Sequence, residues 1–171
     1  MTHLPSLRAD AALFDVFNAY PDAARPLLAY TEVLLRGASS LSVGDRERIA
    51  AYVSDLNSCG YCHGIHAATA EALDQDSVDE GGGRLAPILA LVEKLTRTPE
   101  RDPAAEARAV LAAGWDEQAL FEAVSICGLF NLMNRLVAGL GIAASPDCLQ
   151  MAAERLAAGG YAGLEAALDA D

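Results

Sequence analysis

Apolar residues recur at helical spacing along most of this 171-residue chain, in segments bounded by proline or glycine. A half-buried strand would show apolar residues at every second position, and we find no segment with that alternation. The pattern therefore predicts an all-α, multi-helix fold. The expected helices cover residues 10–20, 22–36, 42–56, 59–73, 85–97, 103–113, 116–140 and 146–158, with a short last helix after Gly159 and Gly160.

The length and composition predict one folded domain that covers residues 1–171. Hydrophobic residues make up 53% of the chain, which is more than disordered chains contain. A chain of this length corresponds to about one domain. The clearest loop covers residues 74–84 and includes three consecutive glycines. It is too short to separate two domains.

The charge of the chain argues against polyanionic partners. Its 24 acidic and 12 basic residues give a net charge of -12, so we expect no binding to nucleic acid or to anionic membranes. We also expect no membrane-spanning helix, because four polar residues interrupt the most apolar stretch, residues 119–144. These are Glu122, Asn131, Asn134 and Arg135.

The first residues carry acidic side chains where an export signal needs an apolar core, which predicts a cytoplasmic protein. Structural disulfides are rare in that reducing compartment, and a close cysteine pair there is typically redox-active or metal-binding. Cys59 and Cys62 form such a pair. We interpret Cys127 and Cys148, which stand alone, as small buried hydrophobic residues.

The segment from Cys59 to His66 concentrates the reactive side chains. On a helix that turns about 100° per residue, Cys59, Cys62, His63 and His66 share about one-third of the circumference. A cysteine at a helix start lies where the helix dipole favours the thiolate, and such placements lower the pKa of a thiol from about 8.5 into roughly the 3.5–7.5 range. An imidazole on the same face can hold or transfer the proton.

Glu47 lies twelve residues before Cys59. On one straight helix the two would be about 18 Å apart, too far for proton transfer. Asn57 and Ser58 are good caps for a new helix, so we expect a break there that lets two helices pack side by side. The Glu47 carboxylate would then orient His66. We expect that neither side chain is needed to build the fold.

Other interpretations of the Cys59–Cys62 pair are weaker. Cys59, Cys62 and His66 could supply three zinc ligands, but no second cysteine pair completes a structural site. The stretch Cys59–His63 also matches the CxxCH pattern of c-type haem attachment, which generally takes place after export. Two buried core cysteines are the remaining alternative. We favour a redox dithiol that needs no metal, haem or flavin cofactor.

The order Glu47, Cys59, Cys62, His66, with the spacing Glu-x11-Cys-x2-Cys-x3-His, resembles the carboxymuconolactone decarboxylase-like superfamily in its alkylhydroperoxidase D-type redox branch. Two later stretches, residues 114–117 and the Phe-Asn-Leu-Met-Asn-Arg segment at 130–135, resemble peroxidase-related members of that family. The resemblance covers residues from about 14 to 142.

This resemblance implies an all-α bundle, a homo-oligomer (a trimer or a hexamer) and reduction of hydroperoxides through a dithiol–disulfide cycle. Its roles carry over residue by residue: Cys62 attacks the peroxide, Cys59 resolves the oxidised sulfur, and His66 and Glu47 relay the proton. The helix-dipole argument favours Cys59 instead as the more acidic thiol. The implied partners are a hydroperoxide and a thiol or lipoyl-type electron donor.

The chain also departs from alkylhydroperoxidase D, which has a histidine where Tyr61 stands. This departure weakens the case that the chain shares the particular substrate or reductant of that enzyme. His63 lies outside the family motif and is interpreted as a solvated helix residue. The alternative functions are a carboxymuconolactone decarboxylase-like lyase, whose chemistry does not need a CxxC pair, and a non-enzymatic redox-sensing or zinc-stabilised module.

The segment at 116–140 is apolar almost all round, which predicts a helix buried in the core or at a subunit contact. Its polar residues Asn131, Asn134 and Arg135 need hydrogen-bond partners if they are buried, so we expect a polar network or a subunit contact there. Trp115, just before this segment, is expected to anchor the packing.

Overall fold

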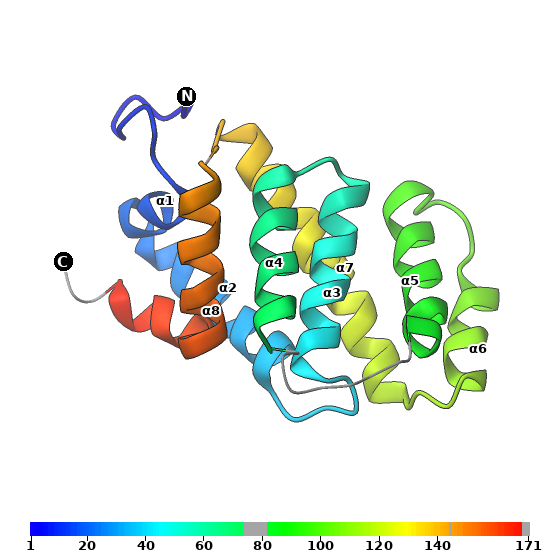
Figure 1. The fold of residues 1–171 in the computed structure, drawn as a ribbon. Helices are drawn as coiled ribbons and strands as arrows, with labels where there is room; N and C mark the ends of the chain where they lie inside the picture. Colours follow the sequence, from blue (N-terminus) through cyan, green and yellow to red (C-terminus); the bar gives the residue numbers. More distant parts are fainter. Residues whose placement is uncertain (74–81, 144, 169–171) are drawn as a thin grey trace.

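The computed structural model of the protein describes residues 1–73, 82–143 and 145–168. Their regular secondary structure is entirely helical (Figure 1), which confirms the predicted all-α fold. In this part of the chain the helices are α1 (Leu13–Ala19), α2 (Pro21–Arg36), α3 (Val43–Leu56), α4 (Gly60–Leu73), α5 (Gly82–Arg97), α6 (Ala104–Ala112), α7 (Glu117–Gly139) and α8 (Pro146–Ala167).

The observed bounds lie within a few residues of most of the expected ones. The loop expected at residues 74–84 falls largely outside the described residues, and its last part, residues 82–84, belongs to α5. The boundary expected at Gly159 and Gly160 is present: α8 consists of two helical segments separated by a kink at Gly160, whose φ and ψ are not helical.

The antiparallel pair α3 and α4 lies in the middle of the molecule (Figure 1). The pair is held from several sides: α4 packs against α8, and α3 packs against α7 and α5. The helices α5 and α6 lie at one end of the bundle, and α1 and α2 lie toward the other. Side chains that face inward from α3 and α4 are therefore covered by α8, α2 and α7.

The turn between α3 and α4 differs from the expected one. Asn57 is the C-terminal cap of α3 rather than the start of the next helix. Ser58 has a positive φ of 55°, a conformation that non-glycine residues adopt mainly at single turn positions. It reverses the chain so that α4 begins at Gly60, and Cys59 lies just before the helix. The predicted break is thus present, with different capping residues.

The long helix α7 supplies much of the core. Asp116 caps its start by accepting a hydrogen bond from the N–H of Ala119 at 2.7 Å. Ile126 and Phe130 are almost completely buried, and burying a side chain of this size stabilises a fold by about 1.5–3 kcal/mol. By length and composition α7 could span a membrane, but half of its most apolar stretch is buried inside the bundle, as in the core helix of a globular fold.

Burial of α7 is incomplete, however. Phe121 is 64% exposed, and Val124 and Leu132 are also exposed. These side chains recur at helical spacing and form an apolar stripe on the outer face of α7. The helix is therefore a core helix on one side and an uncovered apolar surface on the other.

Candidate active site

The packing of α3 against α4 brings Glu47 and His66 into contact. Oε2 of Glu47 lies 2.6 Å from Nδ1 of His66, and both side chains are buried. A carboxylate only accepts hydrogen bonds, so Nδ1 donates to Glu47, and in the neutral imidazole Nε2 keeps its lone pair. The ring of Phe130 meets the imidazole edge-on, with 4.5 Å between ring centroids. The imidazole is therefore fixed both in tautomer and in orientation.

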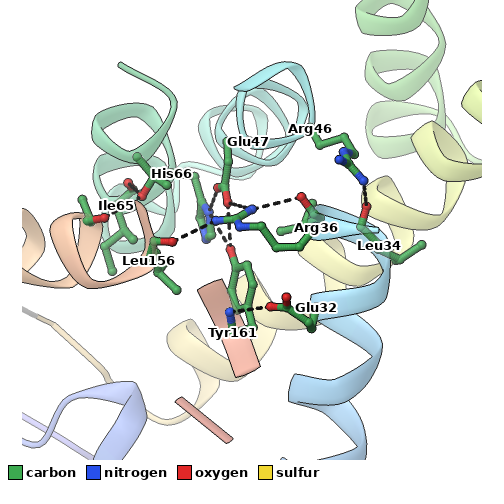
Figure 2. Close-up of polar contacts among 12 residues, drawn as sticks. Glu32, Leu34, Arg36, Arg46, Glu47, Ile65, His66, Leu156 and Tyr161 are labelled. Atoms are coloured by element: carbon green, nitrogen blue, oxygen red, sulfur yellow. Dashed lines mark hydrogen bonds and ion pairs between the residues drawn. The ribbon is translucent and has the colours of Figure 1, made fainter. Parts of the chain in front are cut away.

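This cluster is completed by two residues, Arg36 and Tyr161, that the sequence patterns did not indicate (Figure 2). Arg36, at the end of α2, places Nη1 2.7 Å from Oε1 of Glu47. Tyr161, in α8, donates its hydroxyl to the same oxygen at 3.3 Å. Arg36 also donates to the backbone carbonyl of Leu156 at 3.2 Å. Four helices thus meet at one carboxylate.

The environment of Glu47 determines its charge. Burial disfavours the carboxylate, but His66 and Arg36 outweigh that effect and lower the pKa of Glu47. Glu47 is thus a buried anion with a permanent cation beside it. Because removing one partner of a buried ion pair strongly destabilises a protein, Glu47 also supports the fold, contrary to the expectation from sequence.

A kink in α8 brings Tyr161 to this cluster. Gly160 has φ 61° and ψ -161°, and an added Cβ there would lie 2.8 Å from Oε2 of Glu32. The same oxygen of Glu32 accepts a hydrogen bond from the backbone N–H of Tyr161 at 2.7 Å (Figure 2). It accepts another from the backbone N–H of Ala162 at 3.0 Å. Glu32 therefore caps the last helical segment. Burial raises the pKa of the Tyr161 hydroxyl, which keeps it a hydrogen-bond donor.

Cys59 and Cys62 are both buried and are free thiols. They border different cavities. Cys62 lines a mostly apolar cavity of about 270 Å³ together with His66, Phe130 and Tyr161. Cys59 lines a separate depression beside Asn134. The structure therefore places Cys62, and not Cys59, in the same cavity as the His66 side chain.

The two thiols have opposite pKa shifts. The pKa of Cys59 is lowered to about 6, mainly by a hydrogen bond from the Cys62 side chain. Burial opposes this shift, and hydrogen bonds from the backbone N–H groups of Cys62 and Tyr61 add to it. The same side-chain hydrogen bond, together with burial, raises the pKa of Cys62. The pair therefore carries one negative charge at neutral pH and shares one proton. The helix-start argument agrees with Cys59 as the more acidic thiol.

The polar residues of α7 form the expected network, which extends to this pair. Asn134 donates to the Ser54 hydroxyl at 3.0 Å and accepts from Nδ2 of Asn57 at 2.9 Å. A hydrogen bond from its side chain also helps to lower the pKa of Cys59. Asn57 donates to Oδ1 of Asn131 at 3.2 Å, and Arg135 donates to the same atom at 2.8 Å.

The site and fold can now be compared with known proteins. No family model and no curated protein matches the chain, but solved structures do. An uncharacterized peroxidase-related protein from Silicibacter sp. TM1040 superposes with a TM-score of 0.70 at 21% identity, covering 85% of this chain and 93% of that one.

A second match is titled alkylhydroperoxidase AhpD core, an uncharacterized peroxidase-related protein from Ralstonia eutropha JMP134. It has a TM-score of 0.67 at 22% identity and covers 80% of this chain and 77% of that one. The chain has an alkylhydroperoxidase D-like fold. This finding agrees with the family resemblance seen in the sequence. At this level of identity the likeness shows the fold, and the chemistry has to be argued from the site itself.

The remaining residues singled out from the sequence lie outside the Glu47–His66 cluster, although Cys148 lines the same cavity as Cys62. His63 contacts the backbone carbonyl of Ala51 through Nδ1 at 3.1 Å and lines a different depression from the cavity that Cys62 lines, although the helical spacing predicted a shared face. Cys127 is buried, as expected. Cys148 is exposed, so its interpretation as a buried residue was wrong. It follows Pro146 in the first turn of α8, where few side chains cover it.

Trp115 is buried and its indole N–H donates a hydrogen bond to the backbone carbonyl of Arg84 at 3.0 Å, as expected for a residue that anchors the packing.

A zinc interpretation of the site has no complete set of ligands. Within residues 1–73, 82–143 and 145–168, no group of three or more His, Cys, Asp or Glu side chains is arranged to hold a metal ion. Cys59 and Cys62 border different cavities, and Nδ1 of His66 is already hydrogen-bonded to Glu47. The cluster consists of an imidazole that is hydrogen-bonded to a buried carboxylate and lines a cavity with the Cys62 thiol.

Proposed function

We propose that the protein is a thiol-dependent oxidoreductase that reduces hydroperoxides through a Cys59/Cys62 dithiol–disulfide cycle, with His66 and Glu47 as its proton relay. One observation carries the proposal: Cys62 and His66 line the same apolar cavity, and the Glu47 carboxylate is hydrogen-bonded to Nδ1 of His66. The alkylhydroperoxidase D-like fold, and solved structures with that fold named peroxidase-related, support it.

In the first step the Cys62 thiolate attacks the outer oxygen of the hydroperoxide and breaks the O–O bond. The sulfur becomes a sulfenic acid, and the alkoxide that leaves takes a proton from His66, which has accepted it from the thiol pair. The Glu47 carboxylate stabilises the imidazolium that forms in between. Arg36 and Tyr161 keep that carboxylate charged and correctly oriented.

The pKa and the position of the two sulfurs favour different attacking residues. Cys59 has the lower pKa, but it lines a depression outside the cavity that contains His66. We assign the attack to Cys62, because of these two sulfurs only that of Cys62 lies in the cavity that contains the proton donor. The Cys62 thiolate forms when the proton shared by the pair moves to His66.

In the second step the Cys59 thiolate attacks the sulfenic sulfur of Cys62, and the hydroxide that leaves takes a proton from His66, which is reprotonated from solvent, and departs as water. The product is a disulfide between residues 59 and 62, which lie within one helical turn. An external thiol or lipoyl-type donor then returns the pair to the dithiol and is itself oxidised. The net reaction converts a hydroperoxide and two thiol equivalents into an alcohol, water and a disulfide.

The two alternatives lack an observation in their favour. A decarboxylase on the same fold has no use for the Cys59–Cys62 pair or for its lowered pKa. A redox-sensing module needs the thiols but not a 270 Å³ cavity beside His66.

The decisive assay follows hydroperoxide loss with purified protein and a panel of reductants that includes lipoyl and thioredoxin-type donors. Turnover that requires both the protein and a donor is the expected result, and Cys62→Ser should abolish it. If the wild-type protein consumed no hydroperoxide with any donor, and its thiols survived excess hydroperoxide, the proposal would be wrong.

A further inference from the structure

The cavity that Cys62 lines is apolar on almost all sides, and one permanent charge lies at its wall. Its lining includes Phe14, Phe17, Ile65, Met133, Met151 and Leu164. Arg155, from α8, lines the same cavity and is exposed to solvent. Ligand cavities of proteins are typically apolar with a small number of polar groups that orient the ligand.

Arg155 has no partner among the residues that the structure describes: it forms neither an ion pair nor a hydrogen bond there. The chain nevertheless has twice as many acidic as basic residues. Other cations are paired, such as Arg36 with Glu47 and Lys94 with Glu106. The neighbouring acid Glu154 accepts a hydrogen bond from Gln150 instead.

The position of Arg155 matches the shape of an amphipathic ligand. Met151, Ala152 and Arg155 lie on one face of α8, at the three- and four-residue spacing that aligns side chains on a helix, so the cation borders the apolar wall directly. A neutral, compact hydroperoxide gains nothing from such a charge. A molecule with an apolar chain and a carboxylate could fill the cavity and pair its carboxylate with the guanidinium.

We propose that Arg155 selects hydroperoxides of fatty acids, binding the substrate carboxylate while the apolar chain occupies the cavity and brings the peroxide group to Cys62. The reaction itself rests on the proposed function, whereas recognition of the carboxylate rests on Arg155 and the cavity. Arg155 is a specificity-determining residue in this proposal and takes no part in proton transfer.

The kinetic test compares linoleic acid hydroperoxide with its methyl ester, which has the same chain and peroxide but no charge. For the wild type we expect kcat/KM to be about tenfold higher for the acid, the order of one charge-assisted hydrogen bond. Arg155→Ala should reduce this ratio to about one, and Arg155→Lys should keep part of it. Arg101→Ala removes an equal charge at an exposed site paired with Glu100 and should keep the full ratio.

A binding test separates this inference from the reaction. Decanoate and 1-decanol are titrated into the reduced protein by calorimetry, and we expect decanoate to bind more tightly to the wild type and with equal affinity to decanol in Arg155→Ala. Equal binding of the two by the wild type, or an unchanged preference in Arg155→Ala, would overturn the role of Arg155. If decanoate binding depended on Arg155 but no hydroperoxide, including cumene hydroperoxide, were consumed, only the proposed function would fail.

Discussion

Oε2 of Glu47 lies 2.6 Å from Nδ1 of His66, although the two residues are 19 positions apart and belong to different helices. Oε1, the second carboxylate oxygen, is shared by Arg36 and Tyr161. The Glu47 carboxylate thus contacts two different groups: the His66 imidazole, which can transfer a proton, and the Arg36 guanidinium, which cannot. Its role in reactivity and its role in stability can therefore be separated by substitution.

Replacing the imidazole tests the proton relay. His66→Asn should slow the reaction of the thiol pair with hydroperoxide by roughly 10²–10⁴-fold, the usual contribution of acid–base assistance. Part of the loss should be recovered at alkaline pH, where Cys62 ionises without help. Stopped-flow measurement of the single-turnover rate checks this. His63→Asn, on the same helix but outside the cavity, is the matched control and should react at the wild-type rate.

Removing the charge of Glu47 tests its second role. Glu47→Gln leaves the Arg36 guanidinium without its counter-charge in the interior, which should lower the free energy of unfolding by about 3–5 kcal/mol. Adding Arg36→Met removes the stranded charge and should restore part of that loss. Urea unfolding of the single and double variants measures both effects. Glu106→Gln, which breaks the partly exposed pair with Lys94, should change stability only slightly.

The same carboxylate predicts how stability changes with pH. The pKa of Glu47 is lowered from 4.5 in the folded protein, so its stabilising contribution is complete above about pH 4.5 and is lost as the pH falls toward the folded pKa. The stability difference between the wild type and Glu47→Gln should therefore narrow below pH 4.5. A difference that stayed constant down to pH 3 would show that the pKa of Glu47 is not lowered by folding.

The acidity of Cys59 can be measured directly. With a pKa of about 6, this thiol is mainly a thiolate at neutral pH, and its rate of alkylation should fall as the pH drops through 6. Cys62→Ala removes the hydrogen bond that contributes most, so the midpoint should move up toward 9.0, the ordinary value for a thiol. Alkylation with iodoacetamide, followed by mass mapping of Cys59, gives both midpoints. A wild-type midpoint near 9 would disprove the hydrogen-bonded pair.

The outer face of α7 predicts self-association. Phe121, Val124 and Leu132 form an exposed apolar stripe, and apolar stripes of this kind mark interaction surfaces. We expect a homo-oligomer, a trimer or a hexamer, at micromolar concentration, and Phe121→Ser with Val124→Ser should shift it toward monomer. Light scattering checks both. A wild-type protein that remained monomeric would contradict this prediction.

The helices and the reactive residues could be predicted from the sequence because their signals are local. Helical spacing, capping residues and the Cys59–Cys62 spacing all lie within a few turns of one another. Contact between Glu47 and His66 was also predictable, since one break in the chain suffices to fold two adjacent helices together.

Arg36, Tyr161 and Arg155 could not be found in this way. Arg36 ends an amphipathic helix, where a basic residue is common for reasons of the helix dipole. Tyr161 follows a glycine pair that indicated only a helix boundary. Both reach Glu47 because α2 and α8 pack together, which no local pattern records. The exposure of Cys148 was missed for the same reason, because burial depends on which helices cover a position.

The most direct test of the central claim is the reaction of the fully reduced protein with one equivalent of hydroperoxide, followed by thiol counting and mass mapping. We predict that two thiols are lost per peroxide and that Cys59 and Cys62 form one disulfide within the chain, while Cys127 and Cys148 remain free. Cys59→Ser should instead stop at a sulfenic acid on Cys62. Oxidation found mainly at the exposed Cys148, or no disulfide between Cys59 and Cys62, would contradict the account.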